Sequence, residues 1–194
     1  MAKVIDLKDY QPRKGEKFFV DTNVWYWFTY VPSKVMYMVK KPLNHQVSDY
    51  SAFIERALNI GATLYHCPLI LAELSGVIEN AELEYYNQIK GANINKKAYR
   101  KIIPERKGVS QEVTLAWTTI SSVSEHMITE LTPTSATNVL STFHATTLDT
   151  YDCFYTQIMQ ANNIDNIISD DADFGSCPNS TVFTSNRNLL STHT

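Results

Sequence analysis

Four acidic residues stand in the sequence where folding could bring their side chains together. Asp21 follows the short apolar run 18–20, and Asp171 follows a second apolar run that ends at Ser169. Glu73 lies on the apolar face of a predicted helix, and Asp152 lies near the start of another. In open α/β sheets the ligand crevice forms beyond the carboxyl ends of the strands. We therefore expect these four carboxylates to face one cleft.

Converging carboxylates repel one another and are costly to remove from water, so such a cluster needs a compensating positive charge. Hard oxygen ligands of this type suit Mg²⁺ or Mn²⁺. A divalent cation held there would lower the pKa of a bound water and stabilise the attacking and leaving oxygens of a phosphodiester. The chemistry indicated is metal-dependent hydrolysis, which needs no histidine, cysteine or lysine nucleophile.

Each of these acids taken alone has an ordinary structural explanation. An aspartate at a strand end is usually a turn former or a helix cap, and a lone helical glutamate is usually half exposed. The acidic run 170–173 could equally be a solvated loop. Only the joint placement of the four acids favours a site, so the elements that position them decide the interpretation.

Hydrophobic periodicity predicts an alternation of strands and helices. A helix over 48–58, with Ser48 as N-cap and Gly61 after its end, precedes a second helix that starts at Pro68. Residues 1–16 are interpreted as a lead-in, and residues 81–127 as helical but less regular. Strands are expected at 18–20, 63–66, 128–131, 164–169 and 181–184, and further helices at 133–144 and 149–161. The alternation indicates a parallel sheet covered on both faces.

Composition narrows the class of protein without naming its partner. The formal net charge is −3, and the three cysteines show neither disulfide spacing nor a zinc motif. The first residues lack the apolar segment of a signal peptide, and no apolar run reaches the roughly 18 residues of a membrane span. We expect a soluble, cytoplasmic protein with one domain over residues 1–194. No phosphate-binding glycine loop or serine-hydrolase elbow is present.

Three segments resemble the PIN-domain nucleases, the fold of many toxin ribonucleases of toxin–antitoxin pairs. The first is Phe18-Phe19-Val20-Asp21-Thr22-Asn23, similar to the opening strand of that family and its first aspartate. The second runs from Cys67 to Leu74 and contains Glu73. The third runs from Asp152 through Ile167-Ile168-Ser169-Asp170-Asp171-Ala172-Asp173-Phe174, with Ser169 where the family usually has threonine.

The resemblance implies a three-layer α/β/α fold with a central, mostly parallel sheet. It implies a core over about 17–184 and a helical subdomain over about 81–127. Asp21, Glu73, Asp152 and Asp171 would be the catalytic acids and would bind Mg²⁺ or Mn²⁺ together with Asp173, with Asn23 and Ser169 in supporting roles. The implied activity is endoribonuclease, with RNA as substrate and an antitoxin protein and a second copy of the chain as partners.

A basic stretch in the middle of the chain is a candidate RNA contact. It contains Lys96, Lys97, Arg100, Lys101, Arg106 and Lys107. Basic side chains bind phosphates, although a solvated helical face explains the same pattern equally well. The aromatic run 25–28 is typical of core or interface; Trp25 and Trp27 cannot both face one side of a helix, which favours a partner surface there.

Two other functions remain open from the residues. Phosphatases similar to haloacid dehalogenases also use a strand-end aspartate, but they carry a second aspartate two residues later, where this chain has Asn23. A non-catalytic module that binds RNA or protein could share the same fold. Metal-dependent cleavage of RNA, compared with hydrolysis of a small phosphate ester, separates the three.

Overall fold

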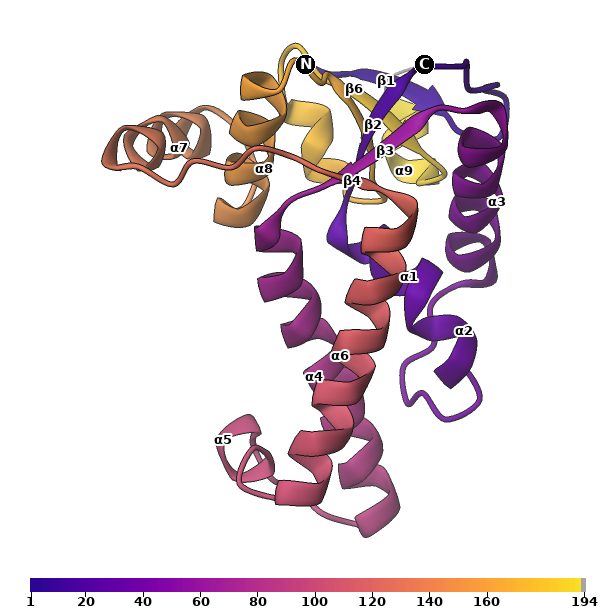
Figure 1. Ribbon diagram of the computed structural model, residues 1–194, viewed down its shortest axis with the longest axis vertical. Coiled ribbons are helices and arrows are strands. Elements are labelled where there is room, and N and C mark those ends of the chain that lie inside the picture. Colours follow the sequence, from indigo (N-terminus) through magenta and orange to yellow (C-terminus); the bar gives the residue numbers. More distant parts are fainter. Residues whose placement is uncertain (193–194) are drawn as a thin grey trace.

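The computed structural model describes residues 1–192 and contains one six-stranded sheet with helices on both faces (Figure 1). The strands are β1 (Lys3–Asp6), β2 (Lys17–Val20), β3 (Thr63–His66), β4 (Glu125–His126), β5 (Asn166–Ile168) and β6 (Thr181–Thr184). They are ordered β1-β6-β5-β2-β3-β4, and every pair is parallel. The prediction of a mostly parallel α/β/α sheet is confirmed.

Helices make up most of the rest of the described chain. They are α1 (Thr22–Thr29), α2 (Val31–Lys34), α3 (Asn44–Ile60), α4 (Pro68–Lys90), α5 (Lys96–Tyr99), α6 (Ile103–Val123), α7 (Pro133–Ala145), α8 (Thr150–Ala161) and α9 (Arg187–Thr192), with a 3₁₀ turn η1 (Ala172–Ser176). None of the helices in residues 1–192 combines the length and the apolar character needed to cross a membrane.

The central strand β2 shows why the fold has three layers. Its side chains alternate between the two faces of the sheet, as in any strand. The Phe18 ring packs edge-on against Phe53 of α3, with ring centroids 5.6 Å apart. The Phe19 ring packs on the other face against Tyr155 of α8, at 5.2 Å. Both phenylalanines are fully buried, so β2 is covered by helices on each side.

Strand order places a topological switch point beside β2. The chain proceeds from β2 outward to β3 on one side, while β5 pairs with β2 on the other side and leads to β6. Val20 and Ile168, the last residues of β2 and β5, are partners in the register. The segments that follow these two strands therefore leave the sheet at the same edge, where ligand crevices form in folds of this class.

The helices α4 and α6 extend well beyond the sheet as a pair and form an arm with α5 near its tip (Figure 1). Of residues 81–127, which were expected to be helical, most lie in the helices of this arm, whereas Glu125 and His126 form β4. The helix α4 begins with Pro68, as predicted, because proline suits the first turn. Gly61 ends α3 in the left-handed conformation, at φ 81°, where a residue with a Cβ would be strained.

Several sequence-based expectations were wrong. Residues 3–6, interpreted as part of a lead-in, form the edge strand β1 against β6, since an edge strand needs only one neighbour. The strand expected at 128–131 is replaced by β4, which ends at His126. Ser48 does not cap α3, because the helix begins one turn earlier, at Asn44.

The expectation of an aromatic partner surface on α1 was also wrong. Trp25 is fully buried and Trp27 is 8% exposed, although the two side chains leave α1 in different directions. The reason is that α1 is covered from several sides, by α3, α4 and α6. This run of aromatic residues belongs to the core.

Candidate active site

Asp21 occupies the first position after β2 and caps α1. Its Oδ1 accepts a hydrogen bond from the backbone N–H of Thr22 at 2.6 Å. Its Oδ2 accepts a hydrogen bond from the hydroxyl of Ser169, which follows the neighbouring strand β5, at 2.7 Å. The side chain is buried, and this burial, with the charges of Glu73 and Asp171, raises the pKa of Asp21 to about 7. Two strand ends are thus joined through one carboxylate.

Glu73 reaches the same place from the second turn of α4. Its Oε2 accepts a hydrogen bond from Thr22 Oγ1 at 2.5 Å and another from the Tyr155 hydroxyl at 2.6 Å. Thr22 is the residue after Asp21, and Tyr155 lies on α8. The carboxylate of Glu73 is therefore held between the start of α1 and the inner face of α8.

Asp152 approaches from α8, where it lies in the first turn rather than at the cap. Asp149 is the N-cap, and its Oδ1 accepts a hydrogen bond from the backbone N–H of Asp152 at 3.0 Å. The Asp152 side chain is 8% exposed. Burial chiefly, and then the charges of Asp21, Asp149, Asp171 and Glu73, raise the pKa of Asp152 to about 9. In residues 1–192 no protein donor is found on its carboxylate, which leaves this side chain free to meet a cation.

The adjacent residues Asp170 and Asp171 have different environments. Asp170 accepts hydrogen bonds from Tyr50 at 2.7 Å and from Gln46 at 2.7 Å, both on α3. Asp171 instead caps η1 by accepting the N–H of Asp173 at 2.8 Å, and burial raises its pKa. Asp170 therefore belongs to the framework, whereas Asp171 belongs with the acidic group at the sheet edge.

Glu73 and Asp171 thus lie close enough to both Asp21 and Asp152 to raise the pKa of each, and Ser169 supports Asp21 directly. Asp173 and Asn23 are exposed, and neither touches this group through a side-chain hydrogen bond. No group of three or more His, Cys, Asp or Glu side chains that could hold a metal ion as arranged is found in residues 1–192. The donor set is chemically suited to a hard cation, because it offers only oxygen ligands and one buried carboxylate without a protein donor.

Sequence reasoning assigned no role to three residues that the structure places at the site. Thr22 and Tyr155 bind Glu73, and Asp149 contributes negative charge beside Asp152. A signal for Tyr155 was present, because it lies three residues after Asp152 and so on the same face of a helix. Nothing in the sequence indicated that Thr22, between two polar residues, would turn toward α4.

The basic residues of the arm fall into two groups. Arg100 pairs with Glu79 through two bonds, and Arg106 lies 3.4 Å from the same buried carboxylate. Lys96 reaches the carbonyl of Gly76 on α4 at 3.5 Å. The remaining three basic residues of this stretch are exposed: Lys97, Lys101 and Lys107. Arg100 and Arg106 are exposed as well, but both lie against Glu79, so the three lysines are the side chains more available to a phosphate.

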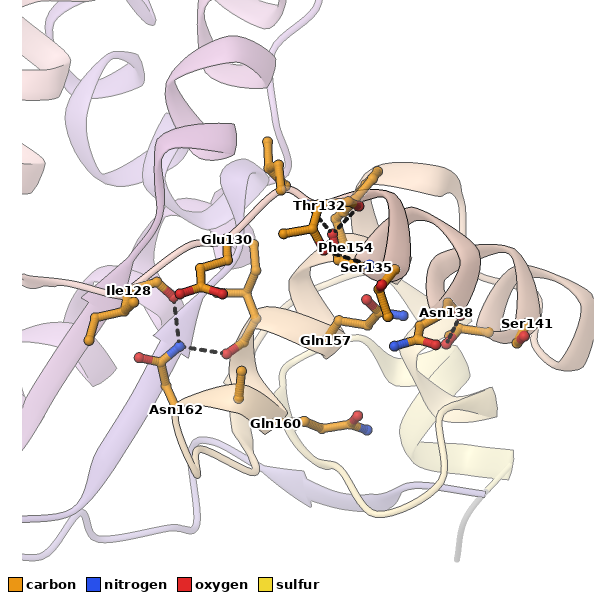
Figure 2. Close-up of a pocket in the computed structure, with 15 residues that line it drawn as sticks. Ile128, Glu130, Thr132, Ser135, Asn138, Ser141, Phe154, Gln157, Gln160 and Asn162 are labelled. Atoms are coloured by element: carbon orange, nitrogen blue, oxygen red, sulfur yellow. Dashed lines mark hydrogen bonds between the residues drawn. The ribbon is translucent and has the colours of Figure 1, made fainter.

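A cavity of about 700 Å³ lies elsewhere, between α7, α8 and the segment before α7 (Figure 2). Phe154 and Gln157 line it from α8, on the helix face opposite Asp152 and Tyr155, and Asn138 lines it from α7. The side chain of Asn162 donates to the carbonyl of Ile128 at 2.9 Å and closes one end. None of the four acidic residues lines this cavity, so it is separate from the carboxylate group.

No protein-family model matches the chain, and no curated protein is significantly similar to it. Among solved structures the chain is similar to one described as the crystal structure of VapBC2 from Rickettsia felis bound to a DNA fragment from their promoter. The identity is 12% and the TM-score 0.49, over 87% of this chain and 98% of that chain. A similarity this distant leaves the chemistry of the protein to be argued from the side chains at the sheet edge.

Proposed function

We propose that the protein is a metal-dependent endoribonuclease. The observation that carries the proposal is the convergence of Asp21, Glu73, Asp152 and Asp171, from four separate segments, at the switch point of a parallel sheet. Burying several carboxylates together is costly without a cation, and the cost appears here as the raised pKa values of Asp21 and Asp152. A purely structural role would not require four such groups in one place.

The residues of the site have different roles in holding a cation. Asp21 and Glu73 are fixed by hydrogen bonds, while none of residues 1–192 donates a hydrogen bond to the carboxylate of Asp152, which is therefore available to a cation. Together with Asp171 they would hold Mg²⁺ or Mn²⁺, which when bound supplies a positive charge for the phosphate and acidifies water. Ser169 keeps Asp21 oriented, the exposed Asp173 would join the cation ligands, and the exposed Asn23 would support the cluster.

The adjacent aspartates provide a matched test of this assignment. We expect Asp171→Asn to reduce cleavage of a mixed cellular RNA pool by about 100-fold or more, because it removes a cation ligand. Asp170→Asn removes the same charge one residue away but loses only framework hydrogen bonds to Tyr50 and Gln46. It should remain active and unfold at a lower temperature. Cleavage assays in EDTA, Mg²⁺ and Mn²⁺ compare the activities of the two variants, and thermal unfolding compares their stabilities. Equal activity of the two variants would contradict the assignment.

The same assay, run with RNA and with a small phosphate ester, separates the alternative functions. A phosphatase similar to haloacid dehalogenases would hydrolyse a small phosphate ester, and a non-catalytic binding module would cleave neither substrate. The residue two positions after Asp21 is Asn23, which is exposed and cannot supply the acid of the covalent route. The nuclease therefore remains the preferred function.

The exposed lysines of the arm are proposed to bind the phosphates of the RNA. We expect the double change Lys101→Ala and Lys107→Ala to weaken RNA binding similarly for all sequences, and to reduce the slope of log affinity against log salt by about one to two. Binding would be measured with the inactive Asp171→Asn protein across salt concentrations. Arg100→Ala should mainly lower stability, because Arg100 is paired with Glu79. An unchanged salt slope in the double variant would exclude the arm from the RNA interface.

The proposal also includes two protein partners, an antitoxin and a second copy of the chain. Both rest on the resemblance of the three acidic segments to PIN-domain toxins and on no contact in the structure. Size-exclusion chromatography of the purified chain would test the second copy directly.

A further inference from the structure

Two hydroxyl groups converge on one oxygen of Glu73. Thr22 Oγ1 lies 2.5 Å from Glu73 Oε2, and the Tyr155 hydroxyl lies 2.6 Å from the same atom. Distances this short are typical of hydroxyl donors to an ionised carboxylate. The two hydroxyl oxygens are themselves 3.1 Å apart. Because each hydroxyl carries a single proton, both protons can point at Glu73 only if neither is shared between Thr22 and Tyr155.

Neither donor is free to move. Thr22 is fully buried as the first residue of α1, immediately after Asp21. Tyr155 is also fully buried, and its ring packs against Phe19 of β2. The two donors thus belong to the elements that carry Asp21 and Asp152, and they tie the position of Glu73 to the positions of those residues.

The other oxygen of Glu73 has a different environment. In residues 1–192 no protein donor is found on Oε1, whereas Oε2 is occupied by two. A carboxylate oxygen that accepts two strong hydrogen bonds has little remaining capacity for a cation. The arrangement therefore selects which oxygen of Glu73 faces a ligand.

We propose that Thr22 and Tyr155 are positioning residues, which hold Glu73 so that Oε1 alone is presented to a bound divalent cation. The inference rests on the proposed function and adds to it a pair of supporting residues outside the acidic set. Mg²⁺ requires nearly ideal octahedral geometry, whereas other divalent ions tolerate more distortion. Loss of either donor should consequently weaken Mg²⁺ binding more than Mn²⁺ binding.

The experiment compares two buried tyrosines that each donate to a glutamate. Tyr155 donates to Glu73, and Tyr30 donates to Glu82 at 2.8 Å, away from the acidic group. We expect Tyr155→Phe to weaken Mg²⁺ binding by about 10-fold or more and Mn²⁺ binding less. Tyr30→Phe should bind both ions as the wild type does. The half-saturating concentration of each ion in RNA cleavage should shift in parallel, with near wild-type cleavage at saturating Mn²⁺.

A second pair of variants guards against a general loss of structure. Thr22→Ser keeps the hydroxyl and should bind Mg²⁺ like the wild type, whereas Thr22→Val, of similar shape, should show the defect of Tyr155→Phe. Titration calorimetry with each ion gives the affinities independently of cleavage. Wild-type protein that binds neither ion would refute the proposed function and this inference together. If the wild type binds the ions and Tyr155→Phe equals Tyr30→Phe, the inference alone is refuted.

Discussion

Replacing Asp152 with asparagine is expected to abolish cleavage and, at the same time, to stabilise the protein in the absence of metal ions. The side chain is 8% exposed and surrounded by the charges of Asp21, Asp149, Asp171 and Glu73, and no donor to its carboxylate is found in the described part of the chain. Asparagine has nearly the same shape but no charge, so it removes the repulsion without opening a cavity. We expect a gain of about 1–3 kcal/mol in the free energy of unfolding at pH 8.

The measurement combines urea unfolding in EDTA with RNA cleavage in Mg²⁺ and Mn²⁺. Cleavage should fall by about 100-fold or more, because the ligand most free to meet the cation is lost. Asp165→Asn, on the exposed turn before β5, removes a charge of the same sign far from this group and should change neither quantity. A destabilised Asp152→Asn protein would mean that the carboxylate has a stabilising partner, contrary to the electrostatic account.

The contribution of Asp21 and Asp152 to the free energy of unfolding without metal ions is expected to fall as pH rises from about 4 to 9, whereas buried His66, whose pKa is lowered to about 4, acts in the opposite direction below about pH 6.5. The folded-state pKa is raised to about 7 for Asp21 and to about 9 for Asp152, whereas an aspartate in the unfolded chain titrates near 3.9. Between these values the folded protein binds more protons than the unfolded chain. Stability is then fully present below the unfolded pKa and is lost as pH rises through each folded pKa. We expect this contribution to fall by several kcal/mol between pH 5 and pH 9.

Divalent cations should reverse that loss. An ion that binds only the folded state at about 100 times its dissociation constant adds about 2.7 kcal/mol. Urea unfolding at pH 5, 7 and 9, with EDTA or with Mn²⁺, measures both effects, and the gain from Mn²⁺ should grow with pH as the carboxylates ionise. The double variant Asp21→Asn with Asp152→Asn should lose most of the pH dependence and most of the response to Mn²⁺. Stability in EDTA that rises toward pH 9 would contradict the raised pKa values.

These two experiments test one physical trade-off. A site built from buried like charges is unfavourable for the empty fold and favourable for binding a cation. Hydrogen bonds from the surrounding residues offset the repulsion between these carboxylates. Tyr50 and Gln46 secure the loop through Asp170, and Ser169 secures Asp21, so that the repelling side chains remain in place.

Local sequence signals determined most of the strands and helices. Pro68 marked the start of α4 and Pro133 the start of α7, because the fixed φ of proline suits the first turn of a helix. Gly61 marked the end of α3, because glycine readily adopts a positive φ. Strands whose formation depends on pairing with a distant strand were predicted less well. The edge strand β1 is only four residues long, with Val4 and Ile5 between two charged residues, and it pairs with β6 alone.

The sequence by itself also predicted that the four acids converge, from strand-end positions and helix faces deduced from hydrophobic periodicity together with the resemblance to PIN-domain nucleases, and their catalytic role stays a prediction. The resemblance to PIN-domain nucleases favoured Asp171 over Asp170, and the tertiary structure added a physical reason, because Asp170 meets Tyr50 of α3. Only the tertiary structure also brought Thr22 and Tyr155 onto Glu73, across 51 and 82 positions of the chain. Periodicity specifies which side of its own element a residue occupies, whereas contacts between elements depend on how those elements pack.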